Sequence, residues 1–240
     1  MAALSGCASF DSGQAVTQER DITDVTTVQL ATPGDLTIVR GATPSLTVTA
    51  GDRIIDRLTN DVDNGELSLD MEGDPMVLNG KIRYELTVPS LESLTVIGSG
   101  AASIDLSGAS EPTITIHGSG DVEASGIDAA EAVLTIEGSG GIEVRDAAIE
   151  SLTVRVDGSG QVAVDGVAST QRVEIKGSGG YQASDLRSAN AFVTLRGSGD
   201  ATVTADETLN AVIDGSGVIV YGGDADVTHN VAGSGDLIRR

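Results

Sequence analysis

Apolar and polar residues alternate with a period of two along most of this chain. In the stretch "LTVIGSG", aliphatic Leu94 and Val96 flank the polar Thr95. Such alternation is typical of a β-strand with one face buried. Each strand of this kind is followed by Gly-Ser-Gly and then by a second alternating segment, as in "GSGDVEAS" from Gly118. The pattern therefore predicts pairs of short strands separated by a Gly-Ser-Gly tripeptide.

The tripeptide occurs eight times, at steps of 18 to 20 residues, and the residue two positions before it is aliphatic in every copy. A unit of this length has too little apolar surface to fold alone, so the units must stack. Stacked columns of aliphatic residues indicate the coils of a parallel β-helix, each about 4.8 Å from the next. The period fits neither a β-propeller blade nor a leucine-rich repeat. The predicted fold is an all-β parallel solenoid.

The paired glycines are predicted to form the corners of the coils, because glycine tolerates a positive φ and close backbone approach. Strand parity places Gly98 and Gly100 inward, like Val96 and Ala102, and leaves Ser99 outward or at the bend. Stacking would align the eight serines into a ladder whose hydroxyls bond to one another or to a ligand. The predicted corner residues are Gly98, Gly100, Gly118, Gly120, Gly138, Gly140, Gly158, Gly160, Gly177, Gly179, Gly197, Gly199, Gly215, Gly217, Gly233 and Gly235.

Three regions are predicted. Residues 1–20 form an N-terminal tether, residues 21–90 a less regular β part that caps the solenoid, and residues 91–240 the regular array of eight coils. Within the cap, Asp56–Gly65 and Asp70–Gly80 are expected to be longer excursions from the coils.

The charge balance limits the partners. The 36 acidic and 14 basic residues give a formal net charge of -22, which repels phosphate backbones and anionic lipid head groups and argues against nucleic-acid binding. Aromatic residues make up 2% of the chain, so the core must be aliphatic. No apolar run reaches the ~20 residues of a membrane-spanning helix.

The single cysteine lies in Leu4-Ser5-Gly6-Cys7, which has the form of a bacterial lipobox. This pattern predicts lipidation of Cys7 and attachment to the membrane through that anchor alone. The six preceding residues are fewer than the charged start and apolar stretch of a secretory signal. An inert free thiol is the alternative.

Candidate catalytic residues are few. His117 lies in an outward column and His229 in an inward one, six coils apart, so they cannot act together. The inward Tyr181 and Tyr221 are expected in the core rather than on a sugar-binding surface. No catalytic residue and no cofactor is therefore predicted.

Acidic residues of neighbouring coils are candidates for a cation site. Glu137 and Asp157 fall side by side, as do Glu123 and Glu143. Two carboxylates supply fewer ligands than Ca²⁺ takes, so the favoured interpretation is a solvated acidic face, with a weak cation site at Glu137 and Asp157 as the alternative. No metal site is predicted.

The array ends in "GSGDLIRR", half a coil with an open strand edge. Either Arg239 and Arg240 protect this edge by their charges, or the edge docks a second copy or an envelope partner.

A strand ending "YELTVPSLESLTVIGSG", followed by repeated "GSG" coils, resembles the GIN-type family of putative bacterial autotransporter-adhesin head domains. The resemblance covers roughly Val25 to Arg240. It implies a right-handed parallel β-helix on a secreted or lipid-anchored protein of the bacterial cell envelope, and no catalytic residues. Its partner would be a surface glycan or protein. The hypotheses are a non-enzymatic adhesin-like scaffold, a carbohydrate-active β-helix enzyme, and a structural spacer or sensor domain that binds an envelope protein.

Overall fold

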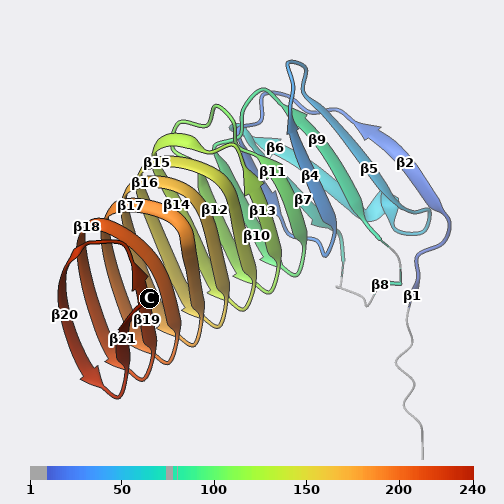
Figure 1. The fold of residues 1–240 in the computed structure, drawn as a ribbon. Helices are drawn as coiled ribbons and strands as arrows, with labels where there is room; N and C mark the ends of the chain where they lie inside the picture. Colours follow the sequence, from blue (N-terminus) through green and yellow to red (C-terminus); the bar gives the residue numbers. More distant parts are fainter. Residues whose placement is uncertain (1–9, 74–77, 80) are drawn as a thin grey trace, which may run out of the picture.

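The computed structural model describes residues 10–73, 78–79 and 81–240. They form a β-solenoid of about seven turns, with 72% of the residues in strands. Coils stack side by side along the rod, with the less regular part of the chain at one end (Figure 1). The only helical element among the described residues is one 3-10 turn, η1 (Ile55–Arg57). The predicted all-β parallel solenoid is confirmed.

The regular array consists of strands that pair in parallel with the strand one coil away, residue for residue. Leu94 lies beside Ile114, and Ile114 beside Leu134. Each coil has one strand before the Gly-Ser-Gly tripeptide and one after it. The strands are β10 (Ser93–Gly98), β11 (Ala101–Asp105), β12 (Thr113–Gly118), β13 (Asp121–Ser125), β14 (Asp128–Gly138), β15 (Gly141–Gly158), β16 (Gln161–Gly177), β17 (Gly180–Gly197), β18 (Asp200–Gly215), β19 (Val218–Gly222), β20 (Asp226–Gly233) and β21 (Asp236–Arg239).

Two outer surfaces follow from this arrangement. We call the outer side of the strands that precede each tripeptide the first face, and the outer side of those that follow it the second face. The long strands β15 to β18 contribute their first residues to the second face and their last residues to the first face. Between the two faces lies one continuous core, which is mainly aliphatic and also contains the buried Tyr84 and Tyr181 and a few buried polar residues such as Gln171. Burial of each Val, Leu or Ile side chain contributes roughly 1.5–3 kcal/mol.

A third, connecting side joins each second-face strand to the next coil, and the coils differ in length here. The pairing of β15 with β16 shifts register between Val144 and Ala147, where Asp146 adopts a positive φ of 55°. Beside the next shift, the core contains a polar network. Buried Gln171 donates to Ser188 Oγ at 2.7 Å and accepts from the Tyr181 hydroxyl at 3.1 Å. Burial raises the pKa of Tyr181, so its hydroxyl stays a donor.

The N-terminal strands stack in an order that differs from their order in the chain. Strands β3 and β4 form a coil that pairs with β10 and β11 on one side, and with β7 and β9 on the other. After β9 the chain therefore crosses the coil of β3 and β4 before it enters the regular array at β10. The bounds are β1 (Phe10–Asp11), β2 (Ala15–Arg20), β3 (Thr27–Leu30), β4 (Asp35–Arg40), β5 (Ser45–Gly51), β6 (Leu58–Asp63), β7 (Glu66–Met71), β8 (Leu78–Asn79) and β9 (Arg83–Val88).

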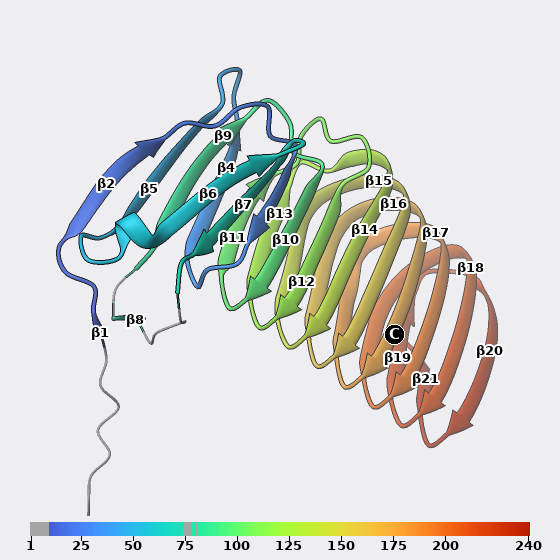
Figure 2. The same cartoon turned by 180° about the vertical axis from the view of Figure 1, so that it is seen from behind.

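Antiparallel strands cover this end of the rod. Strand β5 pairs antiparallel with β9, β2 with β5, and β6 with β7 (Figure 2). At the expected excursion Asp56–Gly65 the chain leaves the parallel coils: these residues include η1, strand β6, which is antiparallel to β7, and the turn at Asn64 and Gly65, both with positive φ. The expected excursion at Asp70–Gly80 lies partly outside the described residues.

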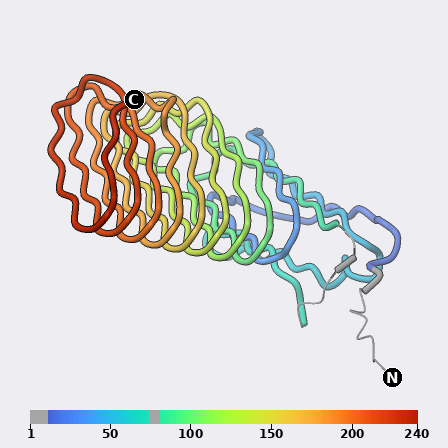
Figure 3. The backbone as a smooth tube through the Cα atoms, turned by 60° about the horizontal axis from the view of Figure 1, so that its bottom comes forward, coloured from blue at the N-terminus to red at the C-terminus, as the bar shows by residue number. Residues whose placement is uncertain are grey.

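The opposite end of the rod is less covered. Strand β20 pairs with β18 and β21 with β19, and neither pairs with a further strand among the described residues. The last coil lies at the free end of the stack (Figure 3). Its inward-column residue Val231 is 37% exposed, whereas Ile213 in the preceding coil is 1% exposed.

Candidate binding faces of the solenoid

The two glycines of each corner differ in their surroundings. The first glycine is exposed or half-buried and has a φ between 93° and 140°, whereas the second is buried in every coil but the last. The expectation that both glycines point inward is therefore wrong for the first one. A Cβ on Gly118 would lie 2.4 Å from the Gly98 carbonyl oxygen, so the first glycine allows the coils to stack. A Cβ on Gly120 would lie 2.7 Å from the Val96 side chain, inside the core.

The eight serines of the tripeptides are exposed. From Ser119 onward, seven of them donate a backbone N–H hydrogen bond to the carbonyl of the first glycine of the preceding coil, as in Ser119 to Gly98 at 2.7 Å. The column is thus held by main-chain hydrogen bonds. The serines are Ser99, Ser119, Ser139, Ser159, Ser178, Ser198, Ser216 and Ser234.

The two histidines lie apart, as their columns predict. His117 lies on the first face, where its Nδ1 and Glu137 Oε2 are 2.9 Å apart. His229 occupies the column of buried Ala211, but it is exposed because it lies in the last coil. Tyr181 is buried, whereas Tyr221 is only partly buried. The described residues bring no acid, base and nucleophile together around either histidine.

One of the two carboxylate pairs is bridged by an arginine of the protein. Glu123 and Glu143 lie side by side, and Arg145 Nη2 is 2.7 Å from Glu143 and 3.8 Å from Glu123. The hydrogen bond and charge of Glu143 raise the pKa of Arg145. Glu137 and Asp157 pair across β14 and β15. Within the described residues, no three His, Cys, Asp or Glu side chains gather as metal ligands.

The second face carries a shallow groove of about 630 Å³ over β13, β15, β16 and β17. Carboxylates and amides line it around a floor of small residues. A Cβ on Gly180 would lie 2.2 Å from Gln161 Oε1, so the glycine lets this amide lie flat along the sheet. Gly141 accommodates Asp121 in the same way, at 2.8 Å. We call this surface the acidic groove, and its polar side chains are Asp121, Glu123, Glu143, Gln161 and Gln182.

The first face carries cations over three neighbouring coils of the same region. In β15 to β17 the outward columns read Thr153, Arg172 and Phe192, then Arg155, Glu174 and Thr194, then Asp157, Lys176 and Arg196. Four cations therefore share these columns with two carboxylates, those of Glu174 and Asp157. We call Arg155, Arg172, Glu174, Lys176, Phe192 and Arg196 the cationic patch. It borders a hollow of about 400 Å³.

Contacts within the patch fix several of its side chains. Glu174 accepts from Arg196 and lies 3.3 Å from Lys176 Nζ. Burial alone would raise the pKa of Glu174, but the hydrogen bonds and charges of Lys176 and Arg196 outweigh it, so the pKa is lowered. The Arg172 guanidinium stacks on the Phe192 ring, 5.2 Å from its centroid, and donates to Ser151 Oγ at 3.2 Å.

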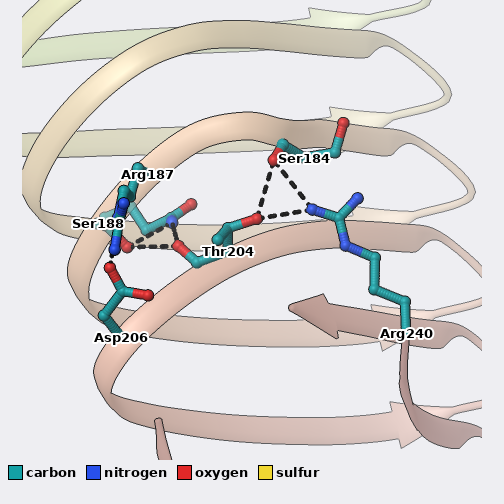
Figure 4. Close-up of polar contacts among 7 residues, drawn as sticks. Ser184, Arg187, Ser188, Thr204, Asp206 and Arg240 are labelled. Carbon is teal, nitrogen blue, oxygen red and sulfur yellow. Dashed lines mark hydrogen bonds and ion pairs between the residues drawn. The ribbon is translucent and has the colours of Figure 1, made fainter. Parts of the chain in front are cut away.

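The two C-terminal arginines turn back along the rod. Arg240 Nη2 donates to the Ser184 carbonyl at 3.0 Å and to Thr204 Oγ1 at 2.8 Å (Figure 4). Arg239 bonds to Gly223 O and pairs with Asp224 at 2.9 Å. Both arginines therefore bind the preceding coils at the open end of the rod.

The predicted lipidation site, Cys7, lies outside the described residues. Among the described residues, no helix has the length and apolar character to cross a membrane.

Sequence reasoning noticed the acidic pairs but missed the cationic patch. The sequence contains a signal for the patch. Its residues stand two apart along each strand, and residues of neighbouring coils stand 19 or 20 positions apart in the chain, which places them in register. Comparing the outward positions of successive coils, as was done for the inward positions, predicts this cluster of cations. The contact between Arg172 and Phe192 depends on side-chain conformation, which spacing does not reveal.

The stacked coils and their outward lattice of side chains define a parallel β-solenoid that presents two extended faces. The family model described as "Putative auto-transporter adhesin, head GIN domain" matches residues 24–225, and the chain belongs to this family. The resemblance read from the Gly-Ser-Gly coils is thus confirmed. Among curated proteins, no sequence matches the chain.

Solved structures share the fold over nearly the whole chain. A putative lipid binding protein from Parabacteroides distasonis ATCC 8503 is 25% identical, with a TM-score of 0.89 over 97% of this chain and 100% of that one. A putative adhesin from the same organism has 19% identity and a TM-score of 0.86 over 97% and 100%. A putative adhesin from Parabacteroides merdae ATCC 43184 has 19% identity and a TM-score of 0.82 over 95% and 97%. The protein is thus an adhesin-like β-helix domain.

Proposed function

We propose that the protein is a non-enzymatic, adhesin-like scaffold of the bacterial cell envelope, anchored by lipid at Cys7, that binds a surface glycan or protein through the lateral faces of its solenoid. The observation that carries the proposal is the fixed lattice of outward side chains. Each coil is hydrogen-bonded to the next, so the spacing of the outward side chains is constant. Side chains two residues apart on a strand are about 6.6 Å apart, and side chains at the same position of neighbouring coils are about 4.8 Å apart.

A lattice of this kind suits binding, because little conformational freedom is lost when a partner contacts side chains on a rigid backbone. Two features support binding at the faces: the acidic groove on the second face and the cationic patch on the first. The family description as an adhesin head domain agrees with a surface or envelope role.

The experiment that tests the proposal is a binding screen of the purified full chain against glycans and intact bacterial and host cell surfaces. A heat-unfolded sample serves as the control for nonspecific adsorption. We expect saturable retention on at least one surface that the unfolded chain does not show. Absence of retention on every cell surface and glycan would overturn the adhesin-like function and favour a spacer or sensor role.

A further inference from the structure

We propose that the cationic patch is a binding site for an anionic polysaccharide, with the Phe192 ring stacking on a sugar ring and Arg155 and Arg172 contacting carboxylate or sulfate groups. This inference rests on the proposed binding function and names the ligand class and the face that takes it. It is drawn from the placement of one exposed aromatic ring among four cations.

The first argument is the exposure of Phe192. The side chain is 41% exposed, although aromatic residues are rare in this chain and its buried tyrosines fill the core. A ring held on a strand by the Arg172 guanidinium offers a flat apolar surface at low entropic cost. Exposed aromatic and arginine side chains in one cluster are typical of binding hot spots.

The second argument is the charge distribution. The chain has 14 basic residues, and four of them lie on the outward columns of three neighbouring coils, where they outnumber the carboxylates of Glu174 and Asp157. Glu174 binds Lys176 and Arg196, but no ion pair or hydrogen bond of Arg155 is seen in the described part of the chain. Arg155 is therefore an exposed cation without an ion-pair partner among the described residues. Its Cα lies about 4.8 Å from the Cα of Glu174, its partner on the next coil.

The net charge of -22 does not prevent such local binding. At physiological ionic strength the Debye length is about 8 Å, so exposed charges further away are largely screened. The acidic groove lies on the second face, across the core from the patch. A flexible polysaccharide can contact the patch without following the acidic surfaces, whereas a DNA duplex has a higher charge density and a rigid, larger footprint.

The arrangement favours a sugar polymer over an acidic peptide. Anionic polysaccharides carry their charges on rings, so one residue can place a ring on Phe192 while its charged group meets a neighbouring arginine. Arginine is suited to this contact because its planar guanidinium binds carboxylate and sulfate oxygens in pairs. Either anion would satisfy this chemistry, so both are probed.

The test is a titration of the full chain with polygalacturonate and with dextran sulfate at physiological salt. Neutral dextran controls for ring stacking without charge, and polyglutamate for charge without rings. The variants are Arg155→Gln and Phe192→Leu, and the matched control is Arg145→Gln, which removes one positive charge from the second face. Because Arg155 and Phe192 are exposed, we expect both variants to keep the melting temperature of the unchanged protein.

We expect binding of at least one anionic polysaccharide, weakened about three- to tenfold by each patch variant and less than twofold by Arg145→Gln, as for the loss of one contact worth about 1 kcal/mol. Preference for one probe identifies the carboxylate or the sulfate as the ligand group. Equal binding of polyglutamate would overturn the sugar and favour an acidic peptide. Binding that neither patch variant changes, or no binding of either probe, would overturn the site, while retention on other surfaces in the screen would leave the adhesin-like function intact.

Discussion

Replacing Gly138 by valine tests how the corners allow the coils to stack. Gly138 has a φ of 139°, in a region that costs a residue with a side chain about 1–3 kcal/mol. Its new Cβ would lie 2.1 Å from the Gly118 carbonyl oxygen, so the coils must separate, at about 1–3 kcal/mol by analogy with overpacked cores. Separation also weakens the 2.8 Å hydrogen bond from Ser139 N–H to the same oxygen, worth about 1 kcal/mol.

These contributions sum to about 3–7 kcal/mol, which for a chain of this size lowers the melting temperature by at least about 6 °C. The assay is thermal unfolding of the full chain followed by circular dichroism. Gly141→Val is the matched control, because its Cβ would meet only the end of the movable Asp121 side chain and its φ lies outside the strained region. Ser139→Ala changes an exposed hydroxyl, so we expect a cost within about 0.5 kcal/mol. A larger loss for Ser139→Ala than for Gly138→Val would refute the stacking role of the first glycine.

Three further predictions concern the anchor, the open edge and the core. Cells given a clickable fatty acid should label the protein at Cys7, and equal labelling of Cys7→Ala would remove the lipoprotein hypothesis. Docking of a second copy on the open edge predicts a dimer that Leu237→Pro converts to a monomer without melting the central coils, since proline cannot donate to a strand ladder; light scattering showing a monomer before and after the change excludes docking. Tyr181→Phe should cost about 1–3 kcal/mol, because it removes the donor to buried Gln171; an unchanged denaturation midpoint would show that the network adds no stability.

The regular array could be predicted because one rule repeats in each coil. Most inward positions are apolar, with buried Gln171 as an exception, and every Gly-Ser-Gly falls at the same corner, so eight copies show the same two-residue alternation. The register of Leu94, Ile114 and Leu134 follows directly from the repeat. A single copy would have shown only a strand of unknown partner.

The cap could not be predicted in the same way. The coil of β3 and β4 lies between β7 with β9 and β10 with β11, so neighbours in the stack are not neighbours in the chain. Alternation marks β9 as a strand but does not say that it pairs parallel with β4 and antiparallel with β5. That choice depends on which edges need covering, which is a property of the assembled solenoid.

Strand alternation does not predict the orientation of the corner glycines correctly. Strand alternation continues only while the backbone stays extended, and the first glycine leaves that conformation with a positive φ. Gly118 is therefore half-buried against the coil before it, whereas Gly120 returns to the inward column. The presence of glycine indicates a bend, but only the structure shows which of the two makes it.

Binding without turnover is the central expectation for this solenoid, and one measurement tests it directly. The full chain is titrated with polygalacturonate while the bound fraction and the chain length of the polysaccharide are followed together over a prolonged incubation. We expect saturable binding with the polysaccharide length unchanged. Steady shortening of the polysaccharide in proportion to the amount of protein, abolished by heat-unfolding the chain, would contradict a non-enzymatic scaffold and establish a carbohydrate-active enzyme.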